Sequence, residues 1–212
     1  MDKEQVQKAL QELQQHPKRK FTQSYDLIIN LKNLVIKSNP IDILITLHYP
    51  KGKKVKVAAF VDQQLVEAAQ KACDLVIRDT EFSKYTDKKA IKRLAEGHDY
   101  FVAQVQLMPK VAATFGRVLG PQGKMPNPKL GCVIPPSANI QLLVDKLNKT
   151  VRLVANKGLN LQCLIGKEDQ PQEQLIDNIL TAYQTVLKQL PEEKQNIKNV
   201  ALKLTMSKPV KI

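Results

Sequence analysis

The chain has 212 residues, of which 43% are hydrophobic and 25% are charged, a balance typical of one large or two small folded domains. Thirty-three Lys and Arg residues against twenty Asp and Glu residues give a net charge of +13, which is typical of proteins that bind a polyanion. No apolar run reaches the roughly 18 residues of a membrane-spanning helix, and the polar first residues lack the apolar core of a secretion signal. We therefore expect a cytoplasmic protein that does not bind a membrane.

Residues that commonly form metal or redox sites are scattered along the chain. Cys73, Cys132 and Cys163 include no C-x-x-C pair, and the three histidines have no metal-ligand spacing. We therefore expect no metal, no cofactor and reduced thiols.

The first elements are a helix and two half-buried strands. A helix is predicted from Asp2 to about His16, because Val6, Ala9, Leu10 and Leu13 fall on one helical face. Alternating apolar and polar residues predict strands at 21–31 and 41–48, with Phe21 on the apolar face of the first. Such strands are typical of an antiparallel sheet that is covered on one side only.

From about residue 51 the pattern changes to short apolar runs separated by helical segments. Strands are predicted at 55–61, 75–77, 101–107 and 132–134. Helices are predicted after Asp62, after a Thr86 cap, over 110–119 and after a Ser137 cap. This alternation predicts a three-layer, Rossmann-like unit with a parallel sheet.

The first pattern returns after Asn148. Strands are predicted at 151–155, 161–165 and 200–206, and a strongly amphipathic helix at 171–190. The predicted fold class is therefore α/β, with an α+β base domain that has an open-faced sheet and an inserted α/β domain. We expect residues 1–50 and 150–212 to form the base domain and residues 51–149 to form the insertion.

The loop at 116–131 (GRVLGPQGKMPNPKLG) holds four of the eight glycines, and all its charged residues, Arg117, Lys124 and Lys129, are positive. Free backbone N–H groups and cations suit a phosphate-bearing partner, whereas the alternative is a solvated surface connection. The loop is not a Walker A motif, because Val118 and Met125 occupy the first Gly and the Ser/Thr positions.

Charge and polar side chains favour RNA over an enzymatic site. Between Tyr100 and Lys167 the only acidic residue is Asp145, which argues against an acidic cluster that would hold Mg²⁺. We expect the segment at 20–24 (KFTQS) to lie beside the segment at 204–209 (LTMSKP) in one sheet. Their hydroxyls, aromatic ring and lysines could contact a folded RNA, or form a polar sheet face in water with Phe21 in the core.

Three motifs resemble the ribosomal protein L1 family of the large subunit. Residues 119–129 (LGPQGKMPNPK) resemble the family's L-G-P-x-G-K-M-P-x-P motif, and residues 20–24 resemble its Lys/Arg-Phe-x-x-Ser/Thr strand entry. Thr205 and Met206 resemble the first two residues of its Thr-Met-Gly, with Ser207 in place of the glycine. The K-M-P form, followed by residues 135–140 (PPSANI), is similar to archaeal members.

The resemblance implies a non-enzymatic constituent of the large ribosomal subunit that is monomeric off the ribosome. It implies that the protein binds 23S-type rRNA at the mobile stalk, near the exit-site tRNA, and assists release of deacylated tRNA. It also implies repression of the protein's own mRNA. The rRNA- and mRNA-binding residues that it implies are Lys20, Phe21, Ser24, Thr205, Met206, Ser207 and Lys208.

The resemblance leaves a second set of residues open, as RNA or tRNA contacts or as part of the hinge between domains. These are Arg117, Gly120, Gly123, Lys124 and Lys129. The alternative function is a nucleotide-dependent enzyme that uses the inserted α/β domain.

Overall fold

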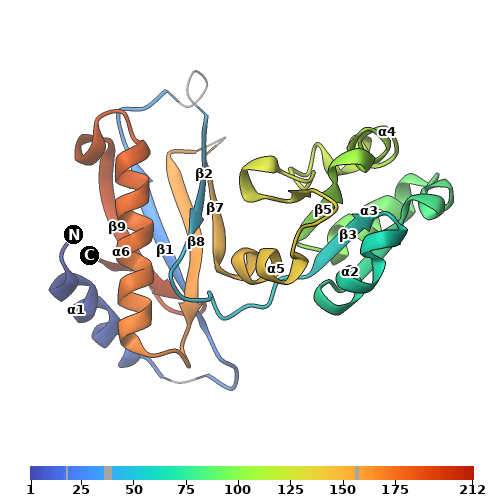
Figure 1. Ribbon diagram of the computed structural model, residues 1–212. Coiled ribbons are helices and arrows are strands. Elements are labelled where there is room, and N and C mark those ends of the chain that lie inside the picture. The colour runs from blue at the N-terminus through green and yellow to red at the C-terminus, as the bar shows by residue number, and fades with distance from the viewer. Residues whose placement is uncertain (18, 36–39, 156–157) are drawn as a thin grey trace. The chain divides into compact units, whose positions relative to one another are not determined.

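The computed structural model describes residues 1–17, 19–35, 40–155 and 158–212 (Figure 1). The chain forms two compact units, one made of Met1–Lys53 with Lys149–Ile212 and the other of Lys54–Asn148. The sheets of the first unit are antiparallel and the sheet of the second is parallel, which confirms the α/β fold class. In the described part of the chain, no helix combines the length and hydrophobicity that a membrane span requires.

The first unit is built on a four-stranded sheet in the order β10-β9-β1-β8. Its strands are β1 (Ser24–Leu31), β8 (Asn160–Lys167), β9 (Ile197–Leu204) and β10 (Val210–Lys211). A second antiparallel pair, β2 (Ile41–Thr46) with β7 (Thr150–Ala155), lies beside β8 (Figure 1). In β1 buried residues alternate with half-buried ones, as in a sheet with one covered face.

Two helices cover the apolar face of this sheet, α1 (Lys3–Gln14) and α6 (Gln172–Gln189) (Figure 1). The face of α1 predicted to be apolar, Val6, Ala9, Leu10 and Leu13, is buried. It packs into one core with alternate residues of the strands and with the apolar side of α6.

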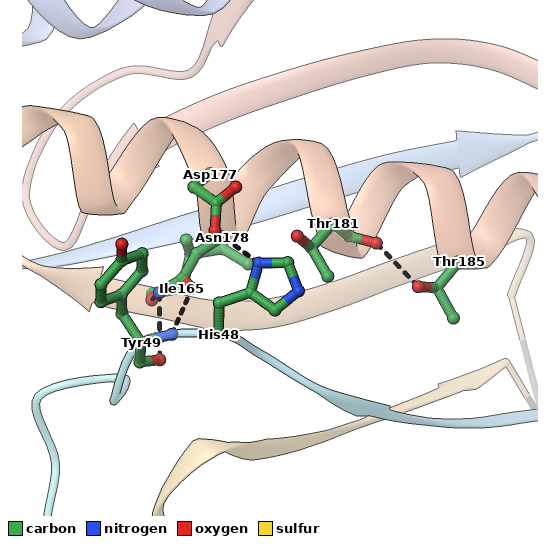
Figure 2. A network of polar contacts seen from close by, with 7 residues as sticks. All are labelled: His48, Tyr49, Ile165, Asp177, Asn178, Thr181 and Thr185. Carbon is green, nitrogen blue, oxygen red and sulfur yellow. Dashed lines mark hydrogen bonds and ion pairs between the residues drawn. The ribbon is translucent and has the colours of Figure 1, made fainter.

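A buried amide joins α6 to the ends of two strands (Figure 2). Asn178 is fully buried; its amide nitrogen donates to the carbonyls of Tyr49 and Ile165, each at 3.2 Å, and its amide oxygen accepts from the N–H of Tyr49 at 3.1 Å. Next to it on the surface, His48 Nδ1 lies 2.6 Å from Asp177 Oδ2. One side chain therefore pairs with three backbone groups and joins α6 to the segments that carry them.

The second unit has a parallel sheet in the order β4-β3-β5-β6. Its strands are β3 (Val57–Val61), β4 (Leu75–Arg78), β5 (Tyr100–Gln104) and β6 (Val133–Ile134). Its helices are α2 (Val66–Ala72), α3 (Lys88–Gly97), α4 (Met108–Leu119) and α5 (Ile140–Lys149), the last of which ends in the first unit. All five residues of β3 are buried, because both faces of the strand are covered.

Several predicted element ends in this unit are wrong by a few residues. The third strand ends at Gln104 and not at residue 107, because a 3₁₀ turn follows and leaves Val105 52% exposed. Asp87, not Thr86, caps α3 by accepting from the N–H of Lys89. The side chain of Asn139, not that of Ser137, accepts the first N–H groups of α5.

Candidate nucleic-acid interface

The structure brings the two segments of the expected RNA site together at one end of the antiparallel sheet. Tyr25 pairs with Leu204 in the β1–β9 ladder, and the chain continues from this pair into both segments. The N–H of Ser24 donates to the hydroxyl of Thr205 at 3.1 Å, and the N–H of Met206 donates to the side-chain oxygen of Gln23 at 3.1 Å. The turn after β9 is therefore held against the start of β1 by two hydrogen bonds.

Gln23 is the residue on which this junction depends, and sequence reasoning did not select it. Its side chain is only 3% exposed, its backbone carbonyl accepts from the N–H of Glu168 at 2.9 Å, and its own N–H donates to the Glu168 carboxylate at 3.3 Å. Gln23 thus joins the segments that precede β1, follow β8 and follow β9. The sequence did contain one indication that Gln23 is buried. Gln23 lies two positions before Tyr25, and residues two apart in a strand share the same face.

The exposed side chains beside this junction are the ones that a ligand can reach. Met206 is 61% exposed and Phe21 is 51% exposed, and Lys20 and Lys208 are exposed as well. We call the seven predicted residues the sheet-end surface: Lys20, Phe21, Ser24, Thr205, Met206, Ser207 and Lys208. An aromatic ring, a thioether and two ammonium groups on one surface suit contacts to nucleobases and phosphates.

Two features of this surface differ from the sequence-based expectation. The interpretation that places Phe21 in the core is wrong, because β1 begins only at Ser24 and Phe21 lies in the preceding segment. Met206 was expected within the last strand, but β9 ends at Leu204 and Met206 lies in the turn that follows. Both differences move a large apolar side chain from the sheet into solvent.

Ser207 closes this turn with its side chain. Its hydroxyl oxygen accepts from the N–H of Leu204 at 2.8 Å and lies 3.1 Å from the carbonyl oxygen of Lys208, to which it can donate. Ser207 is not among the non-glycine residues with positive φ, so a side chain is accepted here without backbone strain. The serine that stands in place of the family's glycine therefore forms hydrogen bonds within the turn to which it belongs.

A cavity of about 520 Å³ adjoins Phe21. It is lined by Gln14, Arg19, Lys20, Phe21, Thr22, Glu168 and Asp169. Burial, followed by the negative charge of Glu168, raises the pKa of the neighbouring Tyr25 phenol, which therefore stays neutral. The cavity thus offers cations on one side and carboxylates on the other, a mixture that can accept both phosphates and hydroxyl donors.

The glycine-rich loop lies in the second unit, where it follows α4 and folds back on α3. The Lys124 ammonium donates to the carbonyl of Ala95 in the last turn of α3, at 2.6 Å, and to the carbonyl of its C-cap residue His98, at 2.8 Å. This contact satisfies carbonyls that a helix end leaves unpaired, and a cation there is favoured by the helix dipole. Lys124 therefore has a structural role at the end of α3, which the sequence analysis did not predict.

The glycines of the loop fit its backbone geometry. Gly123 has a φ of +65°, a conformation that glycine adopts without steric cost. A Cβ on Gly120 would come within 2.7 Å of the Gly116 carbonyl oxygen. Arg117 and Lys129 are exposed, so of the three loop cations these two are available to a ligand.

The geometry of the parallel sheet does not favour the nucleotide-dependent enzyme. In such sheets a nucleotide binds outside the carboxyl ends of the strands, where the strand order reverses, which here is between β3 and β5. At that point the buried side chain of Gln104 accepts from the N–H of Asp62 at 3.0 Å and joins the two strand ends. Among the residues that the structure describes, no group of His, Cys, Asp and Glu could hold a metal ion.

Comparison with known proteins agrees with this picture. The model of the Ribosomal protein L1p/L10e family matches residues 13–208. The chain is 39% identical to the large ribosomal subunit protein uL1 of Nanoarchaeum equitans, over 99% of this chain and 98% of the relative. The uL1 protein of Methanothermococcus thermolithotrophicus is 37% identical, over 100% of this chain and 99% of the relative. That of Thermofilum pendens is 36% identical, over 92% of this chain and 86% of the relative.

Both the family match and the archaeal relatives cover nearly the whole chain, so the resemblance seen in the three motifs and its archaeal type are confirmed. The relatives are ribosomal proteins, which also confirms the expected location at the ribosome. The chain therefore belongs to the ribosomal protein L1 family and is a structural, non-enzymatic constituent of the large ribosomal subunit.

Proposed function

We propose that this protein binds a folded element of large-subunit rRNA through the sheet-end surface of its first unit. The observation that carries the proposal is the turn after β9, which the buried Gln23 holds against the start of β1. Because the turn is fixed by hydrogen bonds, Met206 and Phe21 are presented to a ligand without the entropic cost of ordering a free loop.

The charges agree with an RNA partner. The chain carries a net charge of +13, and Lys20 and Lys208 flank the apolar side chains of the surface. Lysines can neutralise backbone phosphates, and Phe21 can stack on an unpaired base or sugar. The carboxylate of Glu168 lies in the cavity beside Phe21, where it can accept a hydrogen bond from a ribose hydroxyl but repels a phosphate.

On the ribosome, we propose that the rRNA element is the mobile stalk beside the exit-site tRNA, as the family resemblance implies. The protein would then assist the release of deacylated tRNA. A look-alike RNA structure in its own mRNA would occupy the same surface, which makes the protein a repressor of its own synthesis. Off the ribosome the protein is expected to be monomeric.

The direct test is the substitution Met206→Ala in the full chain, with binding to a stalk rRNA fragment as the measurement. We expect a loss of about 1–3 kcal/mol, the scale of one specific contact, which is roughly 5- to 150-fold in Kd. Folding should be unchanged, because the side chain is 61% exposed and its backbone N–H remains bonded to Gln23. Leu142→Ala is the matched control, since Leu142 is 67% exposed in the second unit.

Equal binding by wild type and Met206→Ala would show that the site has been assigned to the wrong surface. The same pair of variants tests the repressor role with the protein's own mRNA as ligand. If one surface serves both RNAs, Met206→Ala weakens both complexes by a similar factor and the rRNA fragment displaces the mRNA. Simultaneous binding of both RNAs would contradict a shared surface.

A further inference from the structure

A second cavity, of about 410 Å³, lies wholly within the second unit. One wall comes from the segment that ends the 3₁₀ helix at 79–84 and begins α3, and the other from α4. The lining residues are Phe82, Ser83, Tyr85, Thr86, Lys88, Ile91, Ala113, Thr114, Arg117 and Val118. Its volume is within the range of pockets that hold a group of nucleotide size.

Two cations line this cavity, Lys88 from the start of α3 and Arg117 from the last turn of α4. Both are exposed, and neither side chain has a hydrogen-bond or ion-pair partner within the described chain. Lys124, in contrast, donates to two backbone carbonyls. Both lining cations therefore remain available to an anion.

The acidic residues near the cavity are engaged elsewhere. Glu81 Oε1 lies 3.3 Å from Lys84 Nζ, and Asp79 Oδ2 lies 3.7 Å from Lys110 Nζ, so both carboxylates form ion pairs. The carboxylate of Asp87 accepts from an N–H in the first turn of α3. The local positive potential from Lys88 and Arg117 is therefore only partly offset.

The remaining lining residues can contact a sugar or a base. Ser83, Thr86 and Thr114 supply hydroxyl groups that can both donate and accept. Tyr85 is half-buried, and its ring is supported by Phe115 at a centroid distance of 5.4 Å. A supported aromatic ring next to cations is a common platform for a nucleobase.

The position of the cavity distinguishes it from the site of a free nucleotide. Its lining includes the connection that follows β4 but no residue near the ends of β3 and β5, between which the strand order reverses and a nucleotide site of an α/β unit is expected. Beyond Lys88, helix α3 continues with the exposed residues Lys89, Lys92 and Arg93. Within the part of the chain that the structure describes, only Lys92 of these three forms an ion pair, with the Glu96 carboxylate at 3.9 Å. A row of cations that leads away from a cavity suits a polymer with repeated phosphates.

We propose that this cavity is a second RNA contact of the protein, which holds one backbone phosphate between Lys88 and Arg117 with the adjoining nucleoside against Tyr85. The inference rests on the proposed function, because it gives the same protein a second attachment to RNA. The phosphate can come from the stalk rRNA or from the neighbouring tRNA, and the two sources share the same chemistry.

The test measures salt-dependent binding of the full chain to two probes, a stalk rRNA fragment and deacylated tRNA. The double substitution Lys88→Gln/Arg117→Gln removes both charges from the cavity. Lys56→Gln/Lys71→Gln removes two exposed charges of the same unit that do not line it. We expect the cavity variant to weaken one of the two complexes roughly tenfold, with a log–log salt slope lower by about 1, and the control to bind within about twofold of wild type.

The RNA whose affinity falls identifies the source of the phosphate. Arg117→Lys should keep most of the affinity, because it preserves the charge. Unchanged binding of both RNAs by the cavity variant would contradict the inference and leave the proposed function intact, provided that Met206→Ala still weakens the rRNA complex. Micromolar ATP binding that the cavity variant abolishes would also contradict it, and failure of the wild-type chain to bind either RNA would overturn both proposals.

Discussion

At the scale of single residues, the sheet-end surface and the buried Gln23 next to it show a division of tasks. Gln23 and the Ser207 hydroxyl bond the backbone of the turn, while Met206 and Phe21 extend into solvent. The motif resemblance selected the exposed residues but not Gln23 or Glu168, whose contacts join segments far apart in sequence. Such contacts have no local pattern, since they arise only when three strand ends meet in the folded sheet.

The loop cations give a second example of this limit. Sequence composition treats Arg117, Lys124 and Lys129 alike, because each is a positive residue in a loop rich in glycine and proline. The structure separates them, since Lys124 caps α3 and Arg117 lines a cavity. Charge was predictable from sequence, whereas the availability of that charge depends on tertiary contacts.

The three cysteines provide a prediction at the residue scale. Burial raises the pKa of the Cys73 and Cys132 thiols to about 11 and that of Cys163 to about 12. The nearby carboxylate of Asp74 adds to the shift of Cys73. The thiolate is the reactive form, and with a pKa near 11 it makes up only about one part in a thousand at pH 8.

We therefore expect the native protein to react with a disulfide reagent at pH 8 roughly a hundred times more slowly than a free cysteine, whose pKa is about 8.5. The reaction is followed by absorbance, and all three thiols should react rapidly once denaturant is added. A native thiol that reacts as fast as free cysteine would contradict the buried environments described above.

At the scale of elements, hydrophobic periodicity predicted the type of most helices and strands. Several of their ends, which were predicted from capping residues and single apolar residues, were wrong by a few positions. The buried face of α1 follows from a period of 3.6 and the one-sided burial of β1 from a period of 2, whereas the burial of β3 on both faces follows from its continuous apolar run. The cap of α3 was wrong by one position, because Thr86 and Asp87 are both good capping residues and only the backbone geometry decides between them. The first strand was predicted to begin at Phe21 and begins at Ser24. The apolar ring of Phe21 suggested a strand position, but an apolar residue can also be an exposed ligand contact.

The junction of α6 with the strand ends supports a prediction about stability (Figure 2). Asn178→Leu keeps the branching of the side chain but leaves the N–H and carbonyl of Tyr49 and the carbonyl of Ile165 without this partner. A buried backbone group without a partner costs about 1–3 kcal/mol. We expect the free energy of unfolding to fall by about 2–3 kcal/mol in denaturant titrations, the total being limited by local relaxation.

Thr185→Val on the same helix is the control for that measurement. Its hydroxyl donates to the carbonyl of Thr181 at 2.7 Å, a bond within the helix that adds little to stability. We expect a change within about 0.5 kcal/mol. If Asn178→Leu is as stable as Thr185→Val, the amide bonds do not hold α6 to the strand ends.

At the scale of the whole molecule, the chain leaves its first unit after Lys53 and returns to it at Lys149. The first unit carries the sheet-end surface, and the second carries the glycine-rich loop and the cavity between α3 and α4. The net charge of +13 is therefore distributed over two units that each present exposed cations. The expectation of two domains came from the change of hydrophobic pattern, which is a property of the sequence over tens of residues.

The central claim is that this protein holds a folded rRNA element through cationic surfaces. The measurement that tests it most directly is the Kd of the full chain for a stalk rRNA fragment over a range of salt concentrations. We predict tight binding that weakens steeply, with each neutralised phosphate adding about 0.7–0.9 to the log–log slope. Absence of binding in dilute buffer, or an affinity that does not change with salt, would contradict the account.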